Sequence, residues 1–206
     1  MRFLFPRALF RMESSDRSLC LTFDDGPDPL STPEILGILR KYNVKVMFFC
    51  NGFKAENHPA LMDRIISEGH LSGNHGYHHM NGWKTPAERY CNNVLRASER
   101  TSDRIFRPPY GKISLKQYRK LSKRFRLVFW DVMPYDFDRD FGPDKTLSVL
   151  MKKIRNGSIV VLHDKPGSSS LRILGSFIEN ALSKGYKFIL PQPDQYILHP
   201  GFYNSD

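Results

Sequence analysis

Residues 18–27 read SLCLTFDDGP and join an apolar run to a turn that carries two adjacent carboxylates. The apolar run predicts a buried β-strand, and Gly26 and Pro27 must turn the chain directly after it. A turn at this point lets Asp24 and Asp25 point into one pocket. Two carboxylates that are buried together repel each other unless a metal ion or an arginine lies nearby. The motif alone leaves two interpretations open, a charged pocket at a strand end or an ordinary surface turn.

The remaining chain alternates between strand-like and helix-like segments. Further strands are predicted at Val44–Cys50, Leu71–Asn74, Arg104–Phe106, Arg126–Asp131, Ser158–Leu162 and Tyr186–Leu190. Helices are predicted at 31–42, 59–68, 85–100, 114–123, 143–155 and 170–185. This alternation predicts parallel strands joined by right-handed crossovers. We therefore expect the α/β class, in the form of a single distorted (β/α) barrel of about seven parallel strands, with a doubly wound open sheet as the alternative.

Two of the predicted helices begin with the spacing of a capping box, in which a Ser or Thr and a Glu three residues later satisfy each other's backbone N–H groups. These stretches are Ser31-Thr-Pro-Glu34 and Thr85-Pro-Ala-Glu88. Gly69 is expected just past the end of the helix at 59–68, because glycine tolerates the left-handed backbone that often ends a helix.

Length and composition predict one globular domain. The chain has 206 residues, of which 40% are hydrophobic and 25% charged, enough for one core and too few for two ordinary domains. Residues 1–17 are interpreted as an N-terminal arm, and 18–206 as the domain on which the arm packs Phe3, Phe5, Leu9 and Phe10.

The arm is apolar, but it is not interpreted as a signal peptide. Arg7 and Arg11 interrupt its apolar run, and no small-residue cleavage site follows. A cytoplasmic location is expected on this basis, with envelope association or export by another route as the alternative. No other segment approaches the roughly 20 apolar residues that a membrane helix needs.

The net charge of +10 is spread over basic clusters on predicted helices. Such clusters either attract an anionic polymer or form a solvated face. Since no recognised DNA- or RNA-binding module is present, we expect no nucleic-acid partner. The three cysteines are widely spaced and form no CxxC pair, which argues against a cysteine metal site. A monomer is expected.

Reactive side chains follow the predicted strands at their carboxyl ends. They are Asp24, His75, Arg107, Asp131 and His163, with Asp136 a few residues beyond Asp131. In a (β/α) barrel the carboxyl ends of the strands form the face on which active sites are built. We therefore expect these side chains to converge at one end of the barrel.

Two histidines four residues apart follow the third predicted strand. His75 and His79 can reach one ion from a helical turn or a tight loop, whereas His78 points elsewhere at this spacing. With Asp25 they make a set of two histidines and one carboxylate, which suits Zn²⁺, Fe²⁺ or a similar divalent ion. The alternative is a solvated histidine-rich loop without function.

Arg107 opens the rigid turn Arg-Pro-Pro-Tyr-Gly after the fourth strand. Its guanidinium can hold a carboxylate in a fixed orientation, or it can be a solvated side chain on a surface turn. His163 ends an apolar strand, where a lone histidine is more often structural. A second acid or base beside a metal site makes a catalytic role the better interpretation.

Five segments in order resemble the polysaccharide deacetylases with the NodB homology domain, carbohydrate esterase family 4. They are TFDDGP at 22–27, HGYHH at 75–79, RPPYG at 107–111, WDVMPYDF at 130–137 and VVLH at 160–163. The resemblance extends from about Leu19 to Leu190. It implies that 18–206 is a NodB-like catalytic domain with a distorted (β/α) barrel related to the TIM barrel.

The resemblance also implies a hydrolase that removes an acetyl group from a carbohydrate, with an amino-sugar N-acetyl amide as the first candidate and an O-acetyl ester as the second. One divalent metal ion would serve as cofactor, Zn²⁺ in first place and Co, Ni, Fe or Mn as alternatives. The implied metal ligands are Asp25, His75 and His79. The implied catalytic residues are Asp24 as base, Arg107 as its partner, His163 as acid and Asp136 behind it. The implied substrate contacts are Pro108, Tyr110, Trp130 and Leu162, with the Tyr110 N–H facing the oxyanion.

Three positions depart from the family pattern. Gly76 stands where a Ser or Thr usually supports the histidine loop, Phe137 replaces a Trp of the sugar groove, and Val160 replaces a Leu beside the acetyl pocket. None of them removes a metal ligand, an acid or a base. An amidohydrolase for a small non-sugar amide and a catalytically inactive carbohydrate-binding protein are the alternative functions.

Overall fold

The protein is described here by a computed structural model, in which residues 4–14 and 16–191 are placed. At its centre lies a parallel sheet in which β1 (Ser18–Asp24) pairs with β2 (Met47–Cys50) and with β6 (Ser158–His163). Beyond β2 follow β3 (Leu71–Asn74), β4 (Ile105–Phe106) and β5 (Arg126–Leu127), in chain order. The short β7 (Lys187–Phe188) pairs with the first residues of β1.

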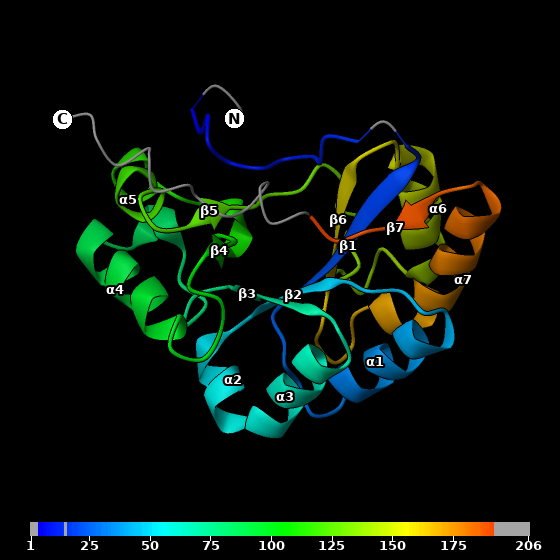
Figure 1. The fold of residues 1–206 in the computed structure, drawn as a ribbon, viewed down its shortest axis with the longest axis horizontal. Coiled ribbons are helices and arrows are strands. Elements are labelled where there is room, and N and C mark those ends of the chain that lie inside the picture. Colours follow the sequence, from blue (N-terminus) through cyan, green and yellow to red (C-terminus); the bar gives the residue numbers. More distant parts are fainter. Residues whose placement is uncertain (1–3, 15, 192–206) are drawn as a thin grey trace.

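The helices form an outer arc around this sheet, as Figure 1 shows. Helices α6 (Pro143–Lys153), α7 (Ser170–Ser183) and α1 (Thr32–Lys41) lie on the side of β1 and β6. Helices α2 (Gly52–Asn57) and α3 (Pro59–Ser67) follow beside β2 and β3, and α4 (Ala87–Ala97) and α5 (Leu115–Leu121) lie beside β4 and β5. Short 3₁₀ turns span Gly82–Lys84 and Pro109–Gly111.

The two ends of the strand path come together because the chain beyond β5 reaches β6. Val132 forms an isolated parallel bridge with Val160, and the Val161 N–H donates to the Val132 carbonyl at 3.0 Å. The sheet is therefore curled into a distorted half-barrel. The predicted fold class is confirmed, and the doubly wound open sheet is not observed.

Side chains of β1 and β6 alternate between the helix layer and the inside of the curl, since successive side chains of a strand point to opposite faces. Leu19, Leu21, Phe23, Val160 and Leu162 pack in the core that the sheet shares with α1, α6 and α7. Their neighbours Cys20, Thr22, Asp24, Ile159, Val161 and His163 therefore face inward. The inward residues change from Cys20 and Ile159 near the amino ends of the two strands, which pack in an apolar cluster, to Asp24 and His163 at the carboxyl ends.

This alternation corrects two predictions. Leu162 does not line a substrate pocket, and Val160 does not lie beside one, because both are fully buried against the helix layer. Val161, one residue away from each, lines the cavity described below. A shift of one residue along a strand moves a side chain to the opposite face, so the error is one of register.

Both predicted capping boxes are also absent, although the helices begin close to the predicted positions. The Ser31 hydroxyl donates to the Asp164 carboxylate at 2.6 Å and makes no cap. The Thr85 hydroxyl donates to the Asn81 carbonyl, and α4 begins without a side-chain cap. A capping box is instead found at Ser114 of α5. Gly69 follows the end of α3 with a left-handed φ of 82°, as predicted.

Helix α2 was not predicted, because its six residues are too few for a periodic apolar pattern. The strand predicted at 126–131 is regular only over Arg126–Leu127, and its remainder forms the bridge region toward β6. In residues 4–14 and 16–191, no helix combines the length and apolar character required to span a membrane.

The described part of the N-terminal segment packs on the half-barrel. The Leu9 N–H donates to the Leu127 carbonyl, and the Leu9 carbonyl accepts from the Phe129 N–H, both at 2.8 Å. The rings of Phe5 and Phe10 stack on Phe129. Phe3 and residues 192–206 lie outside the described residues, and the division into an arm at 1–17 and a domain at 18–206 stays a prediction.

Because Leu162 faces the helix layer, we expect its truncation to lower the stability of the fold and to leave the substrate site unchanged. Leu162→Ala should lower the free energy of unfolding by about 2–5 kcal/mol, since it leaves a cavity between β6 and the helix layer. Urea denaturation followed by circular dichroism measures this change. Wild-type stability of the variant would contradict the burial of Leu162 in this core.

Candidate active site

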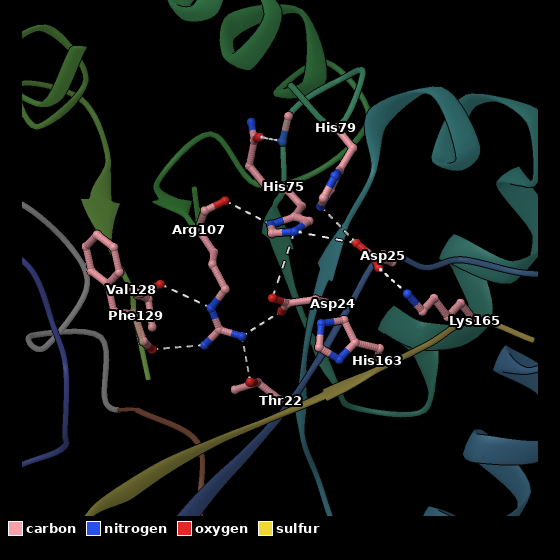
Figure 2. A network of polar contacts seen from close by, with 12 residues as sticks. Thr22, Asp24, Asp25, His75, His79, Arg107, Val128, Phe129, His163 and Lys165 are labelled. Atoms are coloured by element: carbon pink, nitrogen blue, oxygen red, sulfur yellow. Dashed lines mark hydrogen bonds and ion pairs between the residues drawn. The ribbon is translucent and has the colours of Figure 1, made fainter. Parts of the chain in front are cut away.

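A buried ion pair between Arg107 and Asp24 occupies the inside of the half-barrel. The Arg107 Nη1 lies 2.6 Å from the Asp24 Oδ1 and donates to the Thr22 hydroxyl at 2.7 Å. Its Nε and Nη2 donate to the carbonyls of Val128 and Phe129, each at 3.1 Å. Arg107 is 0% exposed and Asp24 4%, so a rigid guanidinium fixes one oxygen of this carboxylate (Figure 2).

Asp25, His75 and His79 form a compact group beside this pair (Figure 2). Their ligand atoms lie within 4.8 Å of one another. The Asp25 Oδ1 is 3.1 Å from the His79 Nε2 and 3.6 Å from the His75 Nε2. The three residues are therefore placed to hold a divalent metal ion, which favours the predicted metal site over the alternative of a solvated histidine-rich loop.

The protonation state of His75 supports this fit. The His75 Nδ1 lies 2.9 Å from the Arg107 carbonyl oxygen, which can only accept, so Nδ1 carries the proton and Nε2 keeps its lone pair. Burial lowers the pKa of His75 to about 4, which leaves the ring neutral at pH 7. Burial tends to raise the pKa of Asp25. The hydrogen bond from His79, and the positive charges of His75, His79 and His163 at the acidic pH where Asp25 titrates, outweigh burial and hold that pKa below its usual range.

A strained turn directs both carboxylates into the site. Asp25 has a left-handed φ of 77°, a conformation that non-glycine residues rarely adopt. The next residue, Gly26, leaves no room for a side chain, since a Cβ there would lie 2.2 Å from the Asp164 Oδ2. Asp164 itself is held by the hydroxyls of Ser31 and Thr32, each at 2.6 Å. The start of α1 thus supports the turn between Asp24 and Asp25.

His163 faces the same site from β6 and is held by Asp136. The His163 Nδ1 donates to the Asp136 Oδ1 at 2.8 Å, and the His163 backbone N–H donates to the Asp136 Oδ2 at 2.7 Å. Asp136 has no exposed surface and also accepts from the Ser168 hydroxyl. Burial lowers the pKa of His163, but the hydrogen bond and charge of Asp136 outweigh it and raise the pKa above its ordinary value.

An open cavity of ≈ 420 Å³ contains these groups. Its lining comprises Asp24, Asp25, His75, His79, Tyr110, Lys112, Trp130, Met133, Phe137, Val161, His163 and Lys165. Of the predicted substrate contacts, Tyr110 and Trp130 lie in this lining, whereas the buried Pro108 does not. Phe137, a departure from the family pattern, packs edge-on against His163 and forms one wall.

Asp131 does not join the other strand-end residues. Its Oδ1 accepts from the Ile159 N–H at 2.9 Å, and its Oδ2 accepts from the Ser158 hydroxyl at 3.0 Å. The side chain therefore ties the bridge region to the start of β6, away from the cavity. Asp24, His75, Arg107, Asp136 and His163 do converge, as predicted.

Four cavity residues were not predicted: Lys112, Met133, Val161 and Lys165. Val161 could have been found from strand periodicity, because it lies two residues before His163 on the same face of β6. Lys112, Met133 and Lys165 lie in loops, where sequence spacing carries no directional signal.

Comparisons with known proteins agree with the geometry. The family model for polysaccharide deacetylase matches residues 11–129, more than half of the chain. A peptidoglycan-N-acetylglucosamine deacetylase of Bacillus cereus is 34% identical over 181 residues, which cover 83% of this chain and 66% of the relative. A chitooligosaccharide deacetylase of a Bradyrhizobium species is 36% identical over 160 residues, covering 73% of this chain and 72% of the relative. The crystal structure of the Bc1960 peptidoglycan N-acetylglucosamine deacetylase has a TM-score of 0.85 and 31% identity, with 92% of each chain covered.

The contact between Asp136 and His163 predicts a change in titration. Because Asp136 raises the pKa of His163, Asp136→Asn should lower it, and the imidazolium should lose its proton at a lower pH than in the wild type. Histidine NMR titration measures the midpoint. His70, whose pKa burial lowers to about 4, serves as the control that should not move. An unchanged midpoint for His163 would contradict the role of Asp136.

Proposed function

The chain belongs to the polysaccharide deacetylase family and is a hydrolase of that class, and we propose that it removes the acetyl group from N-acetylglucosamine residues of a glycan. One observation carries the proposal. A group fit to hold a metal ion, a carboxylate fixed by a buried arginine, and a histidine fixed by a buried carboxylate all line one open cavity. Metal-assisted hydrolysis of an amide uses these three functions together: a metal ion that activates water, a base and an acid.

We propose Zn²⁺ as the ion held by Asp25, His75 and His79, since two imidazoles and one carboxylate with open positions are typical of catalytic zinc. When bound, such an ion polarises the acetyl carbonyl and lowers the pKa of a bound water. The protein supplies the Nε2 atoms of both histidines and the Asp25 carboxylate, with His75 oriented by the Arg107 carbonyl.

Asp24 is the proposed general base. Its Oδ1 is occupied by the Arg107 Nη1 at 2.6 Å, whereas its Oδ2 points toward His75, 3.8 Å from Nε2. The second oxygen is thus available, within the cavity lining, to accept a proton from the attacking water. Arg107 keeps the carboxylate oriented, because its other N–H groups are held by backbone carbonyls.

His163 is the proposed general acid. Its Nδ1 is held by Asp136, so Nε2 is the atom that can give a proton to the departing amine. The raised pKa of His163 favours the protonated form that this step needs. The Tyr110 N–H is proposed to donate to the oxyanion, and Trp130, Met133 and Val161 supply an apolar wall for the acetyl methyl.

The charge of the cavity favours an acidic glycan. Lys112 and Lys165 line it and carry positive charge. A bound divalent cation would add two positive charges, which would offset the negative charges of Asp24 and Asp25. The Lys165 Nζ lies 4.0 Å from the Asp25 Oδ2, so a cation on Asp25 would repel this ammonium and leave it free to pair with a carboxylate of the substrate. Tyr110 and Phe137 expose ring surface at the same cavity. We therefore propose a peptidoglycan strand, whose carboxylates suit the lysines. Such a substrate favours envelope association or export over the cytoplasmic location.

Acetate release tests the function and the substrate. With peptidoglycan, neutral chitooligosaccharides and acetylated xylan as substrates, we expect release from the two N-acetylated glycans, faster from peptidoglycan. A chelator should abolish it and Zn²⁺ should restore it. Lys165→Gln should reduce the preference for peptidoglycan, and Lys145→Gln on the exposed face of α6 should not.

No acetate from any glycan, together with intact glycan binding, would instead establish a catalytically inactive carbohydrate-binding protein. Activity confined to small non-sugar amides would establish the amidohydrolase alternative. Equal rates on acidic and neutral glycans would remove only the preference assigned to the lysines.

Leaving-group chemistry separates the roles of Asp24 and His163. Asp24→Asn keeps the shape but cannot accept a proton, so activity should fall by about 10²–10⁴-fold on every substrate. The activity of His163→Ala should fall most on amides, because an amine must be protonated to depart. It should fall less on an activated acetyl ester, whose phenolate departs without protonation. Steady-state kinetics on the two substrate types measure the difference. Equal losses of His163→Ala on both would mean that His163 is not the acid.

A further inference from the structure

Helix α4 holds the loop that carries both histidine ligands, with Arg96 bonded to the Tyr77 hydroxyl and Asn93 bonded to the loop backbone. The Asn93 Oδ1 accepts from the His78 N–H at 2.8 Å, and the Asn93 Nδ2 donates to the His78 carbonyl at 3.0 Å. The Asn93 backbone carbonyl accepts from the Tyr77 N–H at 3.1 Å. The amide thus pairs with both backbone groups of His78, the last of the three residues between the ligands His75 and His79.

The rest of the loop backbone is also bonded. The Gly76 N–H donates to the Asn74 Oδ1 at 2.8 Å, and the Gly76 carbonyl accepts from the Gly52 N–H at 2.9 Å. The Tyr77 carbonyl accepts from the Phe53 N–H at 3.1 Å. Next to His79, the His78 carbonyl also accepts from the Met80 N–H, whereas the His78 N–H is bonded by the Asn93 Oδ1. Removal of the Asn93 amide would therefore take away the bond to the His78 N–H and one of the two bonds to the His78 carbonyl.

Gly76 and Asn93 fit each other sterically. Gly76 has a φ of 79°, and a Cβ at this position would lie 2.9 Å from the Asn93 Nδ2. A Ser or Thr at position 76 would therefore collide with the amide. The sequence suggested that Gly76, which replaces the usual Ser or Thr, removes a support of the histidine loop. In the structure Asn93 supplies support from the neighbouring helix α4.

We propose that Asn93 is a positioning residue that holds His75 and His79 at the separation required by the metal ion. The inference rests on the proposed metal site and goes beyond it, since Asn93 touches neither the ligand atoms nor the cavity. Side chains that orient ligands from outside the coordination sphere commonly change metal affinity by about 10–100-fold. Asn93, which is 7% exposed, would act in this way through the loop backbone.

The test is a competitive Zn²⁺ titration of the full chain after removal of metal, with thermal unfolding of the metal-free protein measured in parallel. Asn93→Ala should weaken Zn²⁺ binding by about 10–100-fold. Asn92→Ala, on the exposed side of the same helix, should bind as the wild type does. Val94→Ala truncates a fully buried neighbour and should lower the melting temperature while metal affinity is kept.

Asn93→Asp is the second variant in case Asn93→Ala does not fold. It keeps an acceptor for the His78 N–H but places a second oxygen against the His78 carbonyl, so it should also weaken Zn²⁺ binding. Unchanged affinity in both Asn93 variants would overturn the proposal, and so would an equal loss in Val94→Ala, which would make the effect one of stability. A wild-type chain that binds no Zn²⁺ would overturn the metal site and this inference together.

Discussion

The buried guanidinium of Arg107 is the constraint on which the site depends. A charge without exposed surface must be paired and hydrogen-bonded, and Arg107 meets this requirement with Asp24, Thr22 and two carbonyls beyond β5. Those carbonyls belong to the segment that curls the sheet toward β6, so the partners of Arg107 exist only in the closed half-barrel. Its own carbonyl also orients His75. One residue therefore couples the curl of the sheet to the proposed base and to a metal ligand.

The alternation of strand side chains explains why much of this arrangement was visible in the sequence. Polar residues at the carboxyl ends of buried strands converge by topology alone, so Asp24, His75, Arg107 and His163 could be placed together. Leu162 was assigned to the pocket by the family resemblance, and strand alternation shows that this assignment was one residue off, on the helix face of β6. The prediction for Asp131 was wrong for another reason: its carboxylate accepts hydrogen bonds from the Ser158 hydroxyl and the Ile159 N–H of β6 and does not reach the site.

The contacts of residues on helices and loops could not be predicted from the sequence. Ser31 has the spacing of a cap, but a tertiary partner, Asp164, binds its hydroxyl more closely than the helix does. Asn93 lies 14 residues beyond His79 on a helix whose orientation no local pattern sets. Lys165 reaches the cavity from a loop. Such contacts are set by packing and become visible only when the half-barrel is assembled.

Anomalous diffraction from crystals grown with Zn²⁺, recorded on both sides of the zinc absorption edge, tests the central claim most directly. The account predicts one strong peak within coordination distance of the Asp25 carboxylate and the Nε2 atoms of His75 and His79, with Asp24 and His163 facing it across the cavity. Absence of a peak there, or a peak bound by other residues, would contradict the assignment of this site as the metal centre.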